Sequence, residues 1–156
     1  MMDSADLDDI DRTILRELQA NGRISVQDLS QRVGLSASPC ARRMRMLEEA
    51  GIIAGYHALI DEAKVGFGFS VFVSVKLDRQ IDVALKEFET ALRAYPEVVD
   101  CWLMTGDRDY LLRVAVRDTA EFESFLTRRL TKIPVVASIV SSIPLRRVKS
   151  GISRSQ

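Results

Sequence analysis

This chain is short of several kinds of residue, and each shortage removes a class of function. Its 156 residues include one histidine, His57, and two cysteines, Cys40 and Cys101. So few ligands, far apart, form neither a metal-binding cluster nor the disulfide framework of a small secreted protein. The sequence also lacks a glycine-rich phosphate loop and any plausible Ser/His/Asp arrangement. We therefore expect no catalytic site, no cofactor and no bound metal.

Long hydrophobic runs and an excess of charge of one sign are missing as well. No apolar stretch approaches the roughly 18 residues of a membrane span, and the acidic start 1–6 lacks the apolar core of a secretion signal. Lysine plus arginine and aspartate plus glutamate both number 22, so the net charge is zero. A nonspecific coat on nucleic acid is disfavoured by that balance. We expect a cytoplasmic protein with reduced thiols and no membrane partner.

What the sequence does contain is a basic amphipathic helix. The stretch 34–47 opens with Gly34, offers two serines as helix caps, and carries three arginines but no acid. At about 100° per residue, Cys40, Met44 and Leu47 fall on one face. The opposite face carries Ser38, Arg42, Arg45 and Met46. A helix of this kind can pack on a core while it presents hydrogen-bond donors to the major groove of DNA.

Two helices are expected ahead of the basic helix. Asp8 or Asp9 can cap the first, which ends at 21–22 where asparagine and glycine follow each other. Ser25 begins the second in a sequence that resembles a capping box, and Gly34 ends it. Two short helices joined by a tight turn that contains glycine are typical of a helix-turn-helix.

After these helices, residues 52–60 are predicted to form a strand pair or wing. We therefore predict a winged helix-turn-helix domain over residues 1–60. A hinge is expected at 61–66, and a second domain over 67–156.

The second domain begins with a change of hydrophobic period. From residue 67 apolar and polar side chains alternate, with Val71, Val73, Val75 and Leu77 on one face. The elements expected next are a helix over 81–92 before Pro96, strands at 98–104 and 110–116, a helix from Asp118 or Thr119 to 130 before Pro134, and a strand at 135–145. The order β-α-β-β-α-β predicts a ferredoxin-like domain and makes the whole chain α+β.

A ferredoxin-like sheet carries both helices on one face and leaves the other uncovered. Phe72, Trp102 and Val140 are candidates for apolar side chains on the uncovered face. Because such a patch needs a partner surface, we expect the second domain to form a homodimer.

The segment from Thr105 to Tyr110, between the two middle strands, is the one stretch whose composition suggests small-molecule binding. Gly106 can expose backbone N–H groups, and Asp107 and Asp109 flank it. Carboxylates suit an ammonium group, and backbone donors suit a carboxylate. The same residue types are also common in ordinary β-turns, so composition alone leaves both interpretations open.

The order and spacing of these motifs resemble the Lrp/AsnC family, the feast/famine transcription regulators of bacteria and archaea. The matching segments are 7–15, 34–36, Pro39-Cys40 with Arg43 and Arg45, 47–53, 55–56, 105–112 and 148–149. Together they cover nearly the whole chain in register. The resemblance implies a transcriptional regulator with double-stranded DNA as partner, an amino acid or related small molecule as effector, and a homodimer that assembles further, into tetramers or octamers.

Candidate DNA contacts lie on the basic helix, at its start or on the preceding helix: Gln27, Ser36, Ser38, Pro39, Arg42, Arg43 and Arg45. Arg42 and Arg45 point outward and suit base edges or phosphates. Gln27 and the two serines suit phosphates. Arg43 lies about 60° from the core direction, so a phosphate and an acid of its own domain are equally good partners.

In the family the effector sits between subunits, beneath the loop that corresponds to Thr105–Tyr110, and the partner chain adds the segment corresponding to 133–136. The resemblance thus implies that the effector-binding residues are Thr105, Gly106, Asp107, Arg108, Asp109, Tyr110, Ile133, Pro134, Val135, Val136 and Ser141. Two departures affect this set. Where family members more often show Thr-x-Thr, Ile139 replaces one hydroxyl and Ser141 keeps the other. Arg108 adds a cation that can meet a ligand carboxylate or face solvent.

Two other functions remain alternatives. Some haem-pathway decarboxylases resemble this family, but they use histidines near a tetrapyrrole and this chain offers only His57. A DNA-organising member of the same family would bind with a steep salt dependence and little preference among sequences.

Overall fold

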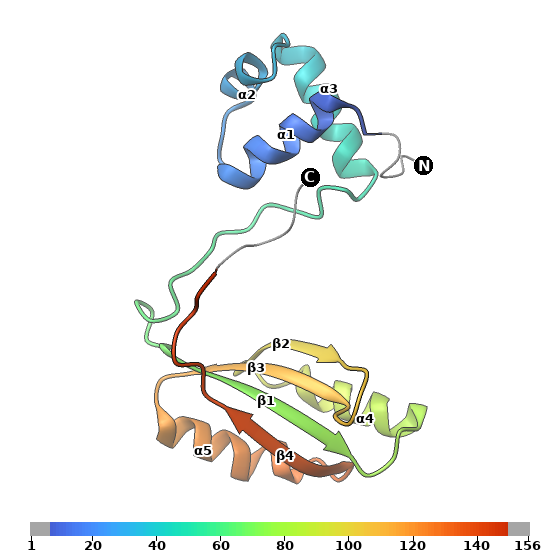
Figure 1. Ribbon diagram of the computed structural model, residues 1–156, viewed down its shortest axis with the longest axis vertical. Coiled ribbons are helices and arrows are strands. Elements are labelled where there is room, and N and C mark those ends of the chain that lie inside the picture. Colours follow the sequence, from blue (N-terminus) through green and yellow to red (C-terminus); the bar gives the residue numbers. More distant parts are fainter. Residues whose placement is uncertain (1–6, 150–156) are drawn as a thin grey trace. The chain divides into compact units, whose positions relative to one another are not determined.

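The computed structural model describes residues 7–149, which form two compact units, one up to Leu59 and one from Ile60 to Val148 (Figure 1). Each unit has its own hydrophobic core. The outer residues of both predicted domains, 1–6 and 150–156, lie outside the described part of the chain. Among residues 7–149, no helix is both long and apolar enough to cross a lipid bilayer.

The first unit is built of α1 (Asp9–Ala20), α2 (Val26–Arg32) and α3 (Ala37–Glu49). Asp8 caps α1 in a capping box, and the Ser25 side chain caps α2 by accepting from the Asp28 N–H group. Gly34 has φ of 71°, a conformation that glycine adopts without strain, and it turns the chain from α2 into α3. The predicted helix-turn-helix is confirmed, with its first two caps.

The core of this unit lies between the three helices. Five side chains are buried in it: Ile14, Leu18, Leu29, Cys40 and Leu47. Met44 packs partly against them, so the predicted inward face of α3 is confirmed. Ser36 is the N-cap residue of α3, although its side chain makes no capping hydrogen bond.

The strand pair predicted for residues 52–60 is wrong. The N–H groups of Ile52 and Ile53 both donate to the Leu47 carbonyl, at 3.0 and 3.1 Å, and close the end of α3. Both side chains then pack partly against the helical core. From 54 to 60 the chain is not part of any described strand. The apolar run therefore finishes a helix and begins a linker.

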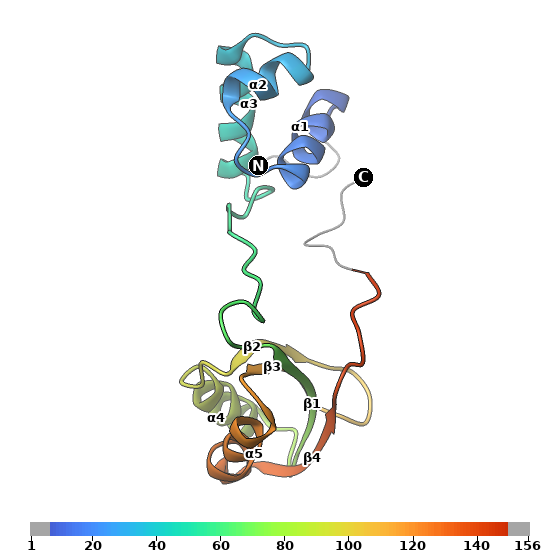
Figure 2. The same ribbon diagram turned by 90° about the vertical axis from the view of Figure 1, so that its left-hand side faces the viewer.

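The second unit follows the predicted order. It contains β1 (Phe69–Leu77), α4 (Asp82–Leu92), β2 (Val98–Leu103), β3 (Tyr110–Val116), α5 (Thr119–Arg128), a 3₁₀ turn (Leu130–Lys132) and β4 (Val136–Ser142). The strands form one antiparallel sheet in the order β2-β3-β1-β4. Both helices cover the same face (Figures 1 and 2), so the ferredoxin-like arrangement is confirmed.

The alternation of inward and outward side chains along β1 explains why the core lies on one face of the sheet. Its inward side chains are those predicted, Val71, Val73, Val75 and Leu77, and all are buried under α4 and α5 with Phe88 and Phe125. Ile81 does not belong to the buried stripe of the first helix. It is the N-cap residue of α4 and is 50% exposed, while Ala84 is buried in the stripe.

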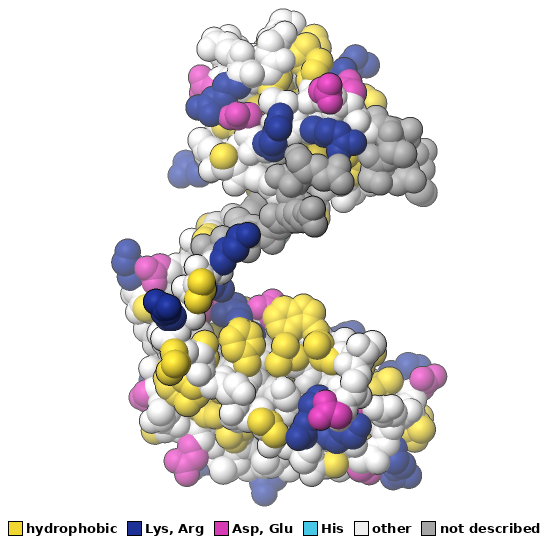
Figure 3. Space-filling view, in the orientation of Figure 1, with side chains coloured by type: hydrophobic (Ala, Val, Ile, Leu, Met, Phe, Trp, Pro, Cys, Tyr) yellow, Lys and Arg dark blue, Asp and Glu magenta, His cyan; other side chains and the backbone are white. Residues whose placement is uncertain are grey.

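The face without helices, here called the open face, mixes apolar and charged side chains. The strand register aligns Trp102, Leu111, Ser74 and Val140 in one row across the four strands. Trp102 and Val140 are each 45% exposed, as predicted. Figure 3 shows hydrophobic side chains gathered over this part of the sheet.

An ion-pair network occupies the next row of the open face. The Arg113 Nε atom lies 2.8 Å from Asp100 on β2, and its Nη1 atom donates to both carboxylate oxygens of Glu62 at 2.9 Å. Residues 61–66, predicted as a hinge, therefore lie within the second unit, because Glu62 is bound to the sheet.

The separate cores predict separate responses to mutation. Leu29→Ala in the first unit and Leu112→Ala in the second each remove a fully buried side chain, which costs about 2–5 kcal/mol of stability. In hydrogen exchange read by mass spectrometry, each variant should lose protection mainly in peptides of its own unit. Equal loss in both units from either substitution would contradict independent cores.

Candidate DNA-binding and effector sites

The outward face of α3 is the first candidate site. Ser38, Arg42, Arg45 and Met46 are all exposed on the side opposite the buried Cys40 and Leu47. Within residues 7–149, neither Arg42 nor Arg45 forms an ion pair with a carboxylate. Both guanidinium groups are thus available to an outside partner.

The other predicted DNA contacts surround this face. Gln27 in the first turn of α2 and Ser36 at the start of α3 are exposed. Pro39 stands in the first turn of α3, where its missing N–H group breaks no helical hydrogen bond. The structure thus places these three residues at the starts of the two helices of the helix-turn-helix.

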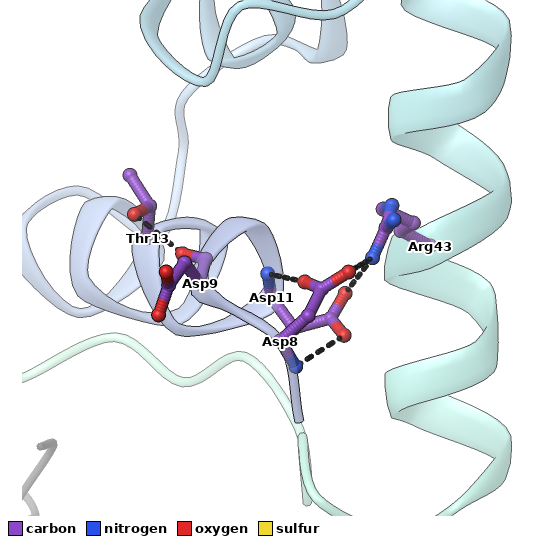
Figure 4. A network of polar contacts seen from close by, with 5 residues as sticks. All are labelled: Asp8, Asp9, Asp11, Thr13 and Arg43. Atoms are coloured by element: carbon purple, nitrogen blue, oxygen red, sulfur yellow. Dashed lines mark hydrogen bonds and ion pairs between the residues drawn. The ribbon is translucent and has the colours of Figure 1, made fainter. Parts of the chain in front are cut away.

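Arg43 has a different environment, shown in Figure 4. Its Nη1 atom donates to an Asp8 carboxylate oxygen at 2.7 Å and to one of Asp11 at 2.8 Å. The Asp11 side chain is only 4% exposed. Of the two partners expected for Arg43, the structure has the acids of its own domain. A DNA contact of Arg43 stays a prediction. Asp8 and Asp11 are partners that sequence reasoning missed, because they lie more than thirty residues away.

These contacts shift the ionisation of the groups involved. Hydrogen bonds to Asp11 and Asp8 raise the pKa of Arg43. The hydrogen bond from the Asp11 N–H group, followed by the contact with Arg43, lowers the pKa of Asp8. Asp8 therefore both caps α1 and binds α3, so one carboxylate connects the start of the first helix to the recognition helix.

The second candidate site lies at one end of the sheet. The N–H of Asp109 donates to the Val75 carbonyl, and the N–H of Asp78 donates to the Val135 carbonyl, both at 2.9 Å. The β2–β3 loop and the start of β4 therefore flank the same end of β1. Gly106, with φ of 119°, forms the tip of the loop. Two segments predicted to bind the effector, 105–110 and 133–136, thus lie at the same end of the sheet, on opposite sides of β1.

Asp109 does not point out of this loop. Its carboxylate is buried, accepts from the Leu77 N–H at 2.7 Å and from the Gln80 side chain, and lies 3.7 Å from the Lys76 ammonium. Burial alone would raise the pKa of Asp109, but these hydrogen bonds and the Lys76 charge outweigh it and lower the pKa. Of the two carboxylates that flank Gly106, that of Asp109 is thus bound within its own chain, whereas Asp107 is 96% exposed.

Three further predicted effector residues face away from the loop's outer surface. The Tyr110 ring is buried against Phe88, and its hydroxyl donates to Glu89 on α4 at 2.8 Å. Ile133 is buried in the same core. Ser141 is paired with the inward-facing Val73 and so lies on the helix side of the sheet. The structure places these three side chains apart from the others, whereas Pro134 is exposed and Val135 and Val136 are partly buried.

Arg108 lies across the open face. Its Nη1 atom donates to the Ser138 hydroxyl on β4 at 2.8 Å, and its Nε atom is 4.0 Å from Asp107. Ser138 is opposite Lys76 in the β1–β4 register. Sequence reasoning missed Ser138, although the period of two that places Val140 on the open face also places residue 138 there.

Comparison with known proteins matches both units. Residues 7–54 match a winged helix-turn-helix DNA-binding family, and residues 70–153 match the Lrp/AsnC ligand binding domain family. The chain is 49% identical over 144 residues to the Bkd operon transcriptional regulator of Pseudomonas aeruginosa, which covers 92% of this chain and 94% of that protein. It is 41% identical over 144 residues to the leucine-responsive regulatory protein of Escherichia coli, with 92% and 88% covered.

Solved structures agree with these sequence relatives. A transcriptional regulator of Neisseria meningitidis, determined in complex with L-Met, superposes with a TM-score of 0.91 at 38% identity, covering 95% of this chain and 96% of that one. An AsnC family regulator of Agrobacterium tumefaciens has a TM-score of 0.88, also at 38% identity and with the same coverage. The fold, the two matched domains and the full-length relatives lead to one conclusion: this chain belongs to the Lrp/AsnC family of transcriptional regulators.

Proposed function

We propose that this protein binds specific operator DNA through α3 and that an amino acid bound to the sheet domain modulates this binding. The observation that carries the DNA assignment is that the arginines of α3 have different partners. Arg42 and Arg45 are exposed and have no carboxylate partner among residues 7–149, while Arg43 is held by Asp8 and Asp11. The helix is thus fixed on one side and presents cations on the other.

In this proposal α3 enters a major groove. Arg42 and Arg45 contact base edges or phosphates, because guanidinium groups match both geometrically. Gln27, Ser36 and Ser38 contact phosphates from the helix starts, and Pro39 shapes the first turn of α3. Arg43 acts as a positioning residue instead of a DNA contact.

The second copy of the reading helix comes from a dimer formed through the open face. Trp102, Leu111 and Val140 form an apolar row there that the chain's own helices do not cover. A second copy that covers this row would remove it from water. The dimer would then present two α3 helices to half-sites about 34 Å apart. Assembly of dimers into tetramers or octamers, and a place in the cytoplasm beside DNA, complete the proposal.

The effector assignment draws on the relatives and on the loop. One relative is named as leucine-responsive, and one solved relative contains L-Met. We assign an amino-acid site to the outer surface of Thr105, Gly106, Asp107 and Arg108, with 134–136 of the partner chain adding to it. A coupling of roughly 1–3 kcal/mol between this site and the DNA-binding state changes operator affinity several-fold to about a hundredfold.

Removing either exposed arginine of α3 should weaken DNA binding. If the arginine contacts a base, we expect Arg42→Ala or Arg45→Ala to lose about 1–3 kcal/mol of DNA-binding free energy. If it contacts a phosphate, the slope of log affinity against log salt concentration should fall by about one. Fluorescence anisotropy over a salt series measures both quantities. Arg93→Ala, an exposed arginine after α4, is the charge-matched control. If Arg42→Ala and Arg45→Ala lose no more DNA affinity than Arg93→Ala, the assignment of α3 as the DNA-binding helix is contradicted.

Arg43→Gln should separate positioning from phosphate contact. Because Arg43 binds Asp8 and Asp11, we expect the variant to lower the stability of the first unit and to move the Asp8 pKa up towards its ordinary value. A lowered carboxyl pKa stabilises the fold above the ordinary pKa and loses this effect as the pH falls through the folded value. The acid unfolding of α1–α3 should therefore depend less on pH in the variant, as circular dichroism would show. If Arg43→Gln instead makes the DNA affinity less dependent on salt, as loss of a phosphate contact would, then Arg43 belongs to the DNA interface.

The dimer proposal predicts that charge on the open face blocks association. Trp102→Glu places a carboxylate in the apolar row, so sedimentation velocity should show dissociation at concentrations where the unchanged protein is dimeric. Val83→Glu on α4 changes an exposed valine outside the open face and serves as the control. A Trp102→Glu protein that keeps its dimer would exclude this interface.

A further inference from the structure

The segment that connects the two units is attached to each of them by a side chain. In the first unit the Tyr56 hydroxyl donates to Glu48 at 3.0 Å, and in the second unit Glu62 accepts from Arg113 at 2.9 Å. We propose that the Glu62–Arg113 pair limits the reach of the DNA-binding unit, so that Glu62 determines which half-site spacing the dimer accepts. This inference rests on the proposed binding of operator DNA by a dimer and adds to it a residue that selects among operators.

Glu62 is the side chain that holds residues 61–68 to the sheet. Both of its carboxylate oxygens accept from the Arg113 Nη1 atom. Every other residue from 61 to 68 is exposed, whereas Glu62 is partly buried. A single hydrogen-bonded turn has little stability on its own. The position of this segment on the sheet therefore depends on the Glu62 contact.

Residues 61–67 form a compact turn that shortens the connection. The N–H of Phe67 donates to the Glu62 carbonyl at 2.8 Å. A Cβ atom at Gly68 would lie 3.3 Å from the Ala63 Cβ atom, so the turn closes against the start of β1. The turn thus takes up chain that would otherwise lengthen the path from the sheet to the first unit.

Arg113 is a well-held point of attachment. It lies on β3, an inner strand, and its side chain is only 17% exposed. Asp100 on β2 binds the Nε atom at 2.8 Å, which leaves Nη1 to Glu62. Charge-assisted hydrogen bonds of this kind are the strong ones. The row of Asp100, Arg113 and Phe72 lies next to the apolar row assigned to the dimer and shares no residue with it.

Tyr56 holds the other end of the connection. Its hydroxyl donates to Glu48 in the last turn of α3, and a Cβ atom at Gly22 would lie 3.9 Å from its ring. Burial, followed by the hydrogen bond to Glu48, raises the pKa of Tyr56 to about 12. The hydroxyl therefore stays protonated at neutral pH and keeps donating. Residues 57–61 are the part of the connection between the two attachments.

Chain geometry converts the two attachments into a length. Tyr56 and Glu62 are six residues apart along the chain, so at about 3.3–3.6 Å per residue they are separated by at most about 22 Å. Without the Glu62 contact the connection runs thirteen residues, to Phe69 at the start of β1, and spans at most about 47 Å. Two such connections in a dimer gain up to about 50 Å, more than the roughly 34 Å of one turn of DNA.

DNA with an altered half-site spacing tests the proposal. The probes are an operator selected from random sequence by the unchanged full-length protein, and the same operator with its half-sites one helical turn, about 10 bp, farther apart. By fluorescence anisotropy the unchanged protein should bind the longer DNA about a hundredfold or more weakly, because the second α3 cannot reach its half-site. Glu62→Gln should lose no more than about tenfold. Its affinity for the original operator should fall about threefold, because a longer connection lowers the effective concentration of the second helix.

Two control variants accompany Glu62→Gln. Glu87→Gln removes the same charge from an exposed residue of α4 and should keep the selectivity of the unchanged protein. An insertion of glycines after Leu59 lengthens the connection without changing the Glu62–Arg113 pair, and it should accept the longer DNA as Glu62→Gln does.

Hydrogen exchange read by mass spectrometry examines the attachment without DNA. Peptides that cover residues 61–68 should exchange roughly tenfold faster in Glu62→Gln than in Glu87→Gln, because the turn loses its charge-assisted contact. Peptides of β1 and β3 should keep their protection, which shows that the variant is folded.

The outcomes separate the two proposals. An equal loss of affinity for the longer DNA in Glu62→Gln and the unchanged protein, or unchanged exchange of 61–68, would overturn the role of Glu62 and leave operator binding standing. Rejection of the longer DNA by the glycine insertion would show that reach does not limit the spacing, and it would overturn the inference as well. A selection that yields no paired half-sites would overturn operator binding by the dimer itself.

Discussion

The one-sided covering of the sheet is the constraint on which the second unit depends. The strands place alternate residues on opposite faces, and α4 and α5 bury only the face of Val71, Val73 and Val75. Every other residue of the four strands is left to a partner, a ligand or water. The open face accordingly contains an apolar row at Trp102, an ion-pair network at Arg113 and a charged edge at Arg108. Each of these features has its place because of that single asymmetry.

In the first unit two different interactions orient α3. Cys40 and Leu47 are buried beneath it, and Arg43 on its flank is bound to the start of α1. Apolar packing alone permits small rotations of a helix about its axis, whereas an ion pair to a capped helix start fixes that rotation. The orientation of Arg42 and Arg45 thus follows from packing and ion pairs inside the first unit. Glu62 has a similar part in the second unit, where it binds the segment 61–66 to the sheet.

The features that sequence reasoning predicted correctly are those with local causes. The caps at Asp8 and Ser25 and the alternation of β1 depend on residues within one turn or one strand. The features that sequence reasoning missed have long-range causes. Among the described residues, the segment 52–60 has no strand to pair with and forms no strand pair. The partners of Asp109 and Arg43 lie about thirty residues away. Ser141 was assigned from a family pattern, whereas the register of β4 places Ser138 beside Arg108.

The buried Asp109 also divides the β2–β3 loop into a part that holds its shape and a part whose side chains do not support that shape. Its carboxylate holds the loop to the end of β1 from inside, through Leu77 and Gln80. The shape of the loop therefore does not depend on Asp107 and Arg108, whose side chains lie outside that anchor. A substitution at either position therefore changes the charge on the outer surface of the loop while the anchor to β1 stays in place.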